Sequence, residues 1–166
     1  MKNTAVLFLI LAFSCVAFAQ KNKMIAEDFS AASMNGQTVE MSSLKGKVVV
    51  MTFWTTRCPI CQAEIPKLNQ LAAQYKNKDV VFLGLTTDNE AKVENYMKKN
   101  FFSFNIIPNS FGILLKYAEK DREGNINVGY PAHFLVNKEG EIELRTSGWD
   151  KTGKLNSEIN RLLSSK

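Results

Sequence analysis

The segment FWTTRCPICQAEIP, residues 53–66, contains two cysteines, Cys58 and Cys61, with two residues between them. They follow an apolar run, VVVMTFW at 48–54, whose β-branched and aromatic residues are typical of a strand buried on both faces of a sheet. After them, apolar residues recur at the spacing of one face of a helix. The cysteines are therefore predicted at a strand-to-helix junction, where a thiol pair could bind a metal, bridge the chain or exchange electrons.

The rest of the chain alternates between strand-like and helix-like patterns. The first half predicts, in order, a hairpin around Asn35-Gly36 within 26–47, the strand 48–54, an amphipathic helix through 65–75, a buried strand over 79–88, and a helix over 90–100 capped by Asp88 and its neighbours. The second half predicts a short strand after residue 101, a turn at Pro108-Asn109, a short helix from about Phe111, a surface loop over 119–127, a hairpin over 132–146 and a final helix over 152–163. This alternation indicates an α/β fold.

The composition fits one globular domain. The chain has 166 residues, of which 45% are hydrophobic and 22% are charged. Its formal net charge is +5, but basic and acidic residues are interspersed and no basic stripe stands out. Nucleic acid is therefore not an expected partner.

Residues 1–19 have the pattern of a secretory signal, with an apolar run that ends in Ala17 and Ala19 on an A-x-A arrangement. The run is shorter than the roughly 20 residues of a membrane span. We expect cleavage after Ala19, which leaves a domain over 20–166 that is exported, with the periplasm as the expected compartment. The alternatives are retention as an N-terminal membrane anchor and lipid attachment at Cys15.

Removal of the signal would leave Cys58 and Cys61 as the two cysteines of the mature chain. A disulfide across so short a loop removes little entropy from the unfolded chain and is a poor structural staple. At a helix N-terminus, the free N–H groups and the helix dipole favour the thiolate of Cys58. Cys61 lies one turn deeper, where burial should keep it protonated. We therefore expect Cys58 to attack and Cys61 to resolve.

Metal binding is the main competing use of this motif. Tetrahedral zinc requires four ligands, whereas the mature chain offers two cysteines and one histidine, His133. His133 lies in a strand-like segment, where its side chain is expected to face solvent or a neighbour. No metal and no cofactor is predicted.

These residues together resemble a known family. The segments AEDFSAASMNGQTVEMSSLKGKVVVMTFW, FWTTRCPIC and GYPAHFLVNKEGEI are similar to the thioredoxin superfamily and, more narrowly, to exported TlpA/ResA-like thiol-disulfide oxidoreductases related to AhpC/TSA redoxins. The resemblance spans about 26–163, and its most specific positions are Trp54, Cys58, Cys61, Glu64, Pro66 and Pro131. It implies a thioredoxin fold, that is, a central mixed β-sheet flanked by helices, with an added N-terminal β-hairpin.

The resemblance also implies roles for residues around the cysteines. Pro131 would be a cis-proline opposite them, and the backbone of Tyr130 would pair with the substrate chain. Trp54 and Arg57 complete the predicted substrate-binding set. Glu64 would transfer the proton of the resolving thiol, although its spacing alone favours an acid that complements the helix dipole.

The sequence departs from relatives at three places near the motif. Thr52 stands where thioredoxin has a buried aspartate, so Glu64 would have to serve as the proton acceptor. Arg57 replaces a common tryptophan, and its guanidinium would stabilise the thiolate unless it points to solvent. The Pro59-Ile60 dipeptide differs from the Gly-Pro of many reducing members, so the motif does not set the direction of electron flow.

The resemblance implies protein disulfides or dithiols as substrates and a membrane thiol-disulfide carrier as electron donor. Two alternatives stay open. Thr55, Cys58 and Pro59 match the T-x-x-C-P motif of peroxiredoxins, although Met51 stands where that family has proline. A copper chaperone would use both cysteines with His133.

Overall fold

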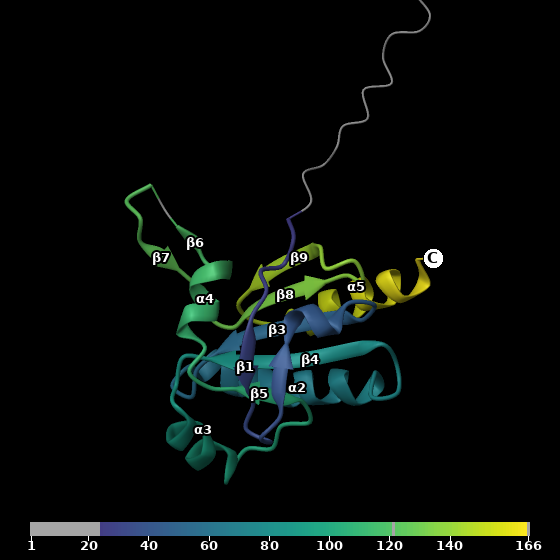
Figure 1. The fold of residues 1–166 in the computed structure, drawn as a ribbon. Coiled ribbons are helices and arrows are strands. Elements are labelled where there is room, and N and C mark those ends of the chain that lie inside the picture. Colours follow the sequence, from purple (N-terminus) through teal and green to yellow (C-terminus); the bar gives the residue numbers. More distant parts are fainter. Residues whose placement is uncertain (1–23, 121, 166) are drawn as a thin grey trace, which may run out of the picture.

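A five-stranded mixed sheet forms the centre of the molecule (Figure 1). The computed structural model describes residues 24–120 and 122–165. The sheet order is β5-β4-β3-β8-β9, with bounds β3 Val48–Trp54, β4 Val80–Thr86, β5 Asn105–Ile107, β8 Ala132–Val136 and β9 Ile142–Ser147. Strands β3, β4 and β5 are parallel, β8 pairs antiparallel with β3, and β9 pairs antiparallel with β8. The expected mixed sheet is confirmed. The predicted signal over 1–19 and Cys15 lie outside the described residues.

Helices and a hairpin cover the two faces of the sheet (Figure 1). One face carries α2 (Pro59–Gln74) and α5 (Thr152–Ser164), and α3 (Glu90–Met97) packs near the end of β3. The opposite face carries the hairpin of β1 (Ser30–Ala32) and β2 (Thr38–Glu40), the 3-10 turn η2 (Met41–Leu44) and α4 (Phe111–Tyr117). All seven residues of β3 are buried, because alternate side chains point into these two layers.

The N-terminal hairpin forms at the predicted place. Gly36 adopts φ +82°, a left-handed conformation that glycine tolerates best. The Met34 N–H donates to the Ile106 carbonyl at 2.8 Å, which fastens the tip of the hairpin to β5. The N-terminal hairpin is therefore attached to the edge of the central sheet.

Two local predictions are corrected. Helix α3 ends at Met97 instead of residue 100, and the Asn100 side chain donates to the Tyr96 carbonyl beyond that end. Within the predicted cap of Asp88 and its neighbours, the N-cap is Asn89, whose side chain accepts from the Lys92 N–H. The expected loop over 119–127 contains two short paired strands, β6 (Glu119–Lys120) and β7 (Ile126–Asn127). Gly124, at φ +84°, permits the tight reversal that brings these strands together.

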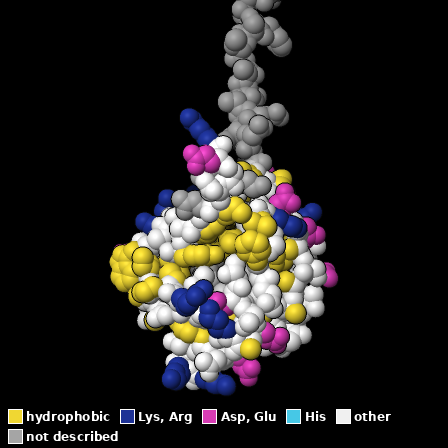
Figure 2. Space-filling view, turned by 90° about the vertical axis from the view of Figure 1, so that its left-hand side faces the viewer, with side chains coloured by type: hydrophobic (Ala, Val, Ile, Leu, Met, Phe, Trp, Pro, Cys, Tyr) yellow, Lys and Arg dark blue, Asp and Glu magenta, His cyan; other side chains and the backbone are white. Residues whose placement is uncertain are grey.

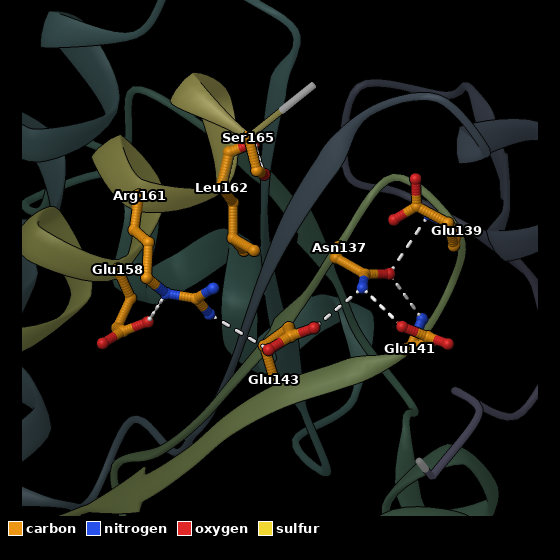
Figure 3. A network of polar contacts seen from close by, with 8 residues as sticks. All are labelled: Asn137, Glu139, Glu141, Glu143, Glu158, Arg161, Leu162 and Ser165. Atoms are coloured by element: carbon orange, nitrogen blue, oxygen red, sulfur yellow. Dashed lines mark hydrogen bonds and ion pairs between the residues drawn. The ribbon is translucent and has the colours of Figure 1, made fainter. Parts of the chain in front are cut away.

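The turn between β8 and β9 is held by one buried side chain, Asn137 (Figure 3). Its amide donates to Glu141 at 2.8 Å and to Glu143 at 2.9 Å. Its carbonyl oxygen accepts from the backbone N–H groups of Glu139 and Glu141 at 3.1 and 2.8 Å. Arg161 on α5 donates to Glu143 at 3.0 Å, so the same network joins the hairpin to the last helix.

Across residues 24–120 and 122–165, the structure contains no helix with the length and apolar character needed to cross a bilayer.

Candidate active site

The cysteine pair lies where β3 ends and α2 begins. Cys58 is the N-cap of α2, and its Sγ accepts a hydrogen bond from the Cys61 N–H at 3.1 Å. The two sulfur atoms form a disulfide across Cα atoms 5.2 Å apart. Sulfur at an N-cap position receives the N–H groups that a helix leaves unpaired, which favours negative charge there when the pair is reduced.

The two cysteines differ in depth, as the sequence predicts. Cys58 is partly exposed, whereas Cys61 is only 1% exposed and packs with Trp54 and Ile65. An incoming substrate sulfur can therefore reach Cys58 but not Cys61. The preceding residue, Arg57, is exposed, and its backbone N–H donates to the Thr55 hydroxyl at 3.3 Å.

Asp88, at the end of β4, fixes the loop that precedes Cys58. Its carboxylate accepts from the Thr56 N–H at 2.7 Å and forms an ion pair with Lys92. Burial raises the pKa of Asp88, but the hydrogen bonds from Lys92 and Thr56 outweigh it and lower the pKa overall. Because β3 and β4 are parallel, their C-terminal ends meet at one edge, and a side chain after β4 can hold the loop after β3.

The peptide bond between Tyr130 and Pro131 is cis, as the resemblance implies. Pro131 and Cys61 line the same cavity, of about 10 Å³, between β3 and α2. Tyr130 is half-buried; burial raises its pKa, a hydrogen bond with Thr87 opposes that shift, and the charge of Asp88 adds to it. The structure thus brings Tyr130 and Pro131 together with the cysteines.

Trp54 lies beneath the cysteines instead of on the substrate-facing surface. Its side chain is 2% exposed and packs against Tyr96 and Phe102, with ring centroids 5.4 and 5.0 Å away. Gly84 leaves room for it, because a methyl group there would lie 3.2 Å from the indole nitrogen. The predicted direct contact of Trp54 with substrate is therefore replaced by a supporting position in the core.

Glu64 is fully buried on α2, one turn after Cys61. Its Oε1 accepts from the Lys67 ammonium at 3.2 Å, and its Oε2 has no hydrogen-bond partner in the described part of the chain. Lys67 also donates to Asp150 at 2.9 Å. An acid that only complements the helix dipole can stay exposed to solvent. The full burial of Glu64 therefore favours the other predicted role, proton transfer, over dipole complementation.

His133 is buried on β8 next to Thr52 on β3. The Thr52 hydroxyl and His133 Nδ1 are 3.0 Å apart and His133 is fully buried, so of the two predicted orientations, toward solvent or toward a neighbour, the structure has the second. Burial, with a smaller contribution from the charge of Lys151, lowers the pKa of His133 to about 4. Within residues 24–120 and 122–165, no group of three or more His, Cys, Asp or Glu side chains is placed to hold a metal ion.

A model of the AhpC/TSA family matches residues 23–145. The chain belongs to the AhpC/TSA family. ResA of Bacillus anthracis, a thiol-disulfide oxidoreductase, is 32% identical over 134 residues, which cover 75% of this chain and 71% of the relative. A ResA of Bacillus cereus is 29% identical over 151 residues, covering 87% of this chain and 83% of the relative.

Solved structures show the same fold. A thiol:disulfide interchange protein of the thioredoxin family from Chlorobium tepidum TLS has a TM-score of 0.76 and 22% identity, covering 88% of this chain and 100% of its own. The predicted thioredoxin fold with an N-terminal hairpin is thus confirmed, and the chain is a ResA-like thiol-disulfide oxidoreductase.

The sequence did not point to three residues of this AhpC/TSA site. Asp88 was interpreted as a helix cap, whereas Lys67 and Asp150 carried no motif. A signal for Asp88 existed, because an acid directly after a parallel strand lies at the same sheet edge as the cysteines. Asp150 gave no such signal, since it lies 83 residues from Lys67.

Proposed function

We propose that the chain reduces disulfides in exported proteins and leaves its own cysteines as a disulfide. The observation that carries this proposal is the asymmetric pair, with a partly exposed Cys58 at the helix N-terminus and a buried Cys61 behind it. In the first step, the Cys58 thiolate attacks one sulfur of the substrate disulfide and the other sulfur leaves as a thiolate. The product is a mixed disulfide between Cys58 and the substrate.

In the second step, the buried thiol of Cys61 gives its proton to Glu64 and attacks the Cys58 sulfur. The mixed disulfide breaks, the Cys58–Cys61 disulfide forms, and the substrate leaves with two electrons gained and two thiols. Glu64 suits this role because it lies one helical turn from Cys61 and has one carboxylate oxygen free of partners in the described part of the chain.

The surroundings of Cys58 support a polypeptide substrate. Helix α4 begins at the same end of the sheet, where the Ser110 N–H donates to the Thr86 carbonyl at 2.8 Å. Figure 2 shows hydrophobic side chains across the face that carries α4 and the β6–β7 hairpin, with charged side chains around them. The exposed apolar residues of α4, β7 and the first turn of α2 are Phe111, Leu115, Ile126 and Ile60.

The remaining roles complete the proposal. The backbone of Tyr130 beside Pro131 pairs with the substrate chain, Arg57 favours the Cys58 thiolate, and Trp54 supports the pair from below. Residues 1–19 direct export to the periplasm, by cleavage or as an anchor. A membrane thiol-disulfide carrier restores the dithiol, because each cycle leaves the pair oxidised.

Trapping of the mixed disulfide tests the cysteine roles. Cys61→Ser should accumulate a covalent adduct with a disulfide-containing protein, visible on a non-reducing gel and lost on reduction. Cys58→Ser should form none. An adduct through Cys61 in the Cys58→Ser variant would reverse the assignment.

The reduction potential tests the direction of electron flow. Equilibration in dithiothreitol or glutathione buffers with acid trapping should give a value near or below about −270 mV for a reductase. A value near about −120 mV would make the chain an oxidant that introduces disulfides. Hydrogen peroxide turnover in the same preparation should be absent, and its presence would favour the peroxiredoxin-type function.

A further inference from the structure

Lys67 joins the buried acid near the cysteines to the loop between β9 and α5. Its ammonium group lies 3.2 Å from Glu64, 2.9 Å from Asp150 and 4.4 Å from the centroid of the Trp149 ring. The Lys67 side chain is 37% exposed, whereas that of Glu64 is 0% exposed. Lys67 is thus both the hydrogen-bond donor and the counter-charge of the buried Glu64 carboxylate.

The position of Lys67 is set by residues 148–150, between β9 and α5. Asp150 accepts its hydrogen bond and Trp149 stacks on its charge, a cation–π contact that favours an ammonium group. Hydrogen bonds from Lys67 to Asp150 and then to Glu64 raise the pKa of the lysine, so it stays charged at neutral pH.

The same loop is tied to the cis-proline turn. The Gly148 N–H donates to the Pro131 carbonyl at 2.9 Å, with Gly148 at φ +85° and Asp150 at φ +57°. Pro131 in turn lines a cavity with Cys61. The loop that contacts Lys67 is therefore linked through Pro131 to the cavity beside Cys61.

We propose that Lys67 is a positioning residue that keeps Glu64 ionised and oriented, so that Glu64 accepts the proton of Cys61 during resolution. This inference rests on the proposed role of Glu64. In the step concerned, the proton moves from Cys61 Sγ to the Glu64 carboxylate, the Cys61–Cys58 bond forms, and the substrate sulfur leaves as a thiolate. Without the lysine charge, a buried carboxylate favours its protonated form, which accepts no proton.

Asp150 is the second carboxylate that contacts Lys67, and Lys151 beside it acts on His133 through its charge. His133 has a pKa of about 4 and is uncharged at neutral pH. Loss of Lys67 would therefore remove the cation that contacts both the Glu64 and the Asp150 carboxylates.

The test is a rapid-mixing reaction of the reduced full-length chain with dithiobis-nitrobenzoate. This disulfide releases one coloured thiolate when Cys58 attacks and a second when Cys61 resolves, so the two steps are observed separately. In Lys67→Met, the midpoint of the pH profile of the second step should rise by about 1 unit or more. Well below the original midpoint, the second step should be about tenfold slower, whereas the first step should be unchanged.

Matched variants exclude a general structural effect. Lys67→Arg keeps the charge and should restore the midpoint. Lys76→Met removes an exposed charge just after α2 and should leave the profile unchanged. An unshifted midpoint in Lys67→Met would overturn the proposal, as would a shift that Lys67→Arg fails to reverse.

Glu64→Gln, alone and combined with Lys67→Met, distinguishes the proposed role of Glu64 from the proposed role of Lys67. If Glu64→Gln leaves the second step and its pH profile unchanged, the role of Glu64 fails and this inference fails with it. If Glu64→Gln slows the second step but Lys67→Met does not shift it, the inference alone fails. If Lys67→Met still shifts the profile in the Glu64→Gln background, the lysine acts by another route and the inference is wrong.

Discussion

Two buried polar clusters lie near opposite ends of the strand β8, and they are built differently. At the β8–β9 turn, both ends of the Asn137 amide are hydrogen-bonded (Figure 3). Near the cysteines, one atom each of Trp54, Glu64 and His133 is buried without a hydrogen-bond partner in the described part of the chain. A buried polar atom without a partner costs about 1–3 kcal/mol, so the unpaired atoms of the second cluster carry a cost that the fully paired Asn137 amide does not.

This difference in hydrogen bonding matches the different roles that we assign to the two clusters. A turn far from the chemistry gains from complete pairing, because nothing there has to change its protonation state. In the proposed mechanism Glu64 exchanges a proton and so has to keep an open position, and its Oε2 atom has no hydrogen-bond partner in the described part of the chain. The comparison predicts that changes at the Asn137 cluster alter stability alone, whereas changes near the cysteines alter stability and reactivity in opposite directions.

The largest expected effect is a loss of folding stability at low pH, caused by the buried His133. Its pKa is about 4 in the folded chain against 6.5 for an ordinary histidine, so the unfolded chain binds a proton first as the pH falls. Stability should therefore be full above about pH 6.5 and should fall by about 3 kcal/mol as the pH drops towards 4. Urea unfolding at a series of pH values measures this loss.

His133→Asn provides the control, because His133 is the single histidine of the chain. The variant should lack this part of the acid dependence, and what remains belongs to the carboxylates. If the two pH profiles were parallel, His133 would titrate normally in the folded chain.

The next effect is the loss of the Asn137 amide. Asn137→Ala should lower the free energy of unfolding by about 2–3 kcal/mol, because two turn N–H groups lose their acceptor. The rate at which the Cys58 thiolate attacks a disulfide should not change. Urea unfolding and that rate are the two measurements, with Asn77→Ala, at an exposed turn, expected within about 0.5 kcal/mol of the parent.

A smaller effect of opposite sign is expected at Glu64. Glu64→Met replaces a buried carboxylate that has one partly exposed partner, Lys67, and should raise the free energy of unfolding by about 1 kcal/mol. The same variant should slow resolution by Cys61. A loss of stability together with unchanged resolution would show that Glu64 is a structural ion-pair residue.

The smallest effect on stability is expected at Arg161, the exposed outer member of the Asn137 network. Arg161 is 51% exposed and pairs with Glu143 and Glu158, so solvent and salt screen its charge. Arg161→Ala should change the free energy of unfolding by less than about 0.5 kcal/mol. A cost as large as that of Asn137→Ala would mean that the ion pairs, and not the amide, hold the turn.

The sequence by itself determined the fold class and the reacting pair. The β-branched and aromatic run Val48–Trp54 predicted a doubly buried strand, and Cys58 followed it at a helix start. These features depend on local periodicity, turn chemistry and helix ends, which neighbouring residues set. The cis bond at Pro131 was predicted by the resemblance, since the aromatic residue before the proline favours it only weakly.

Only the tertiary structure decided which distant polar groups meet around that pair. Asp88 holds the cysteine loop because two parallel strands end together, and Thr52 meets His133 because β3 pairs with β8. Asp150 reaches Lys67 across 83 residues of chain. Such contacts depend on strand order and helix placement, and burial then alters the charge states of the groups, so no periodicity in the sequence specifies them.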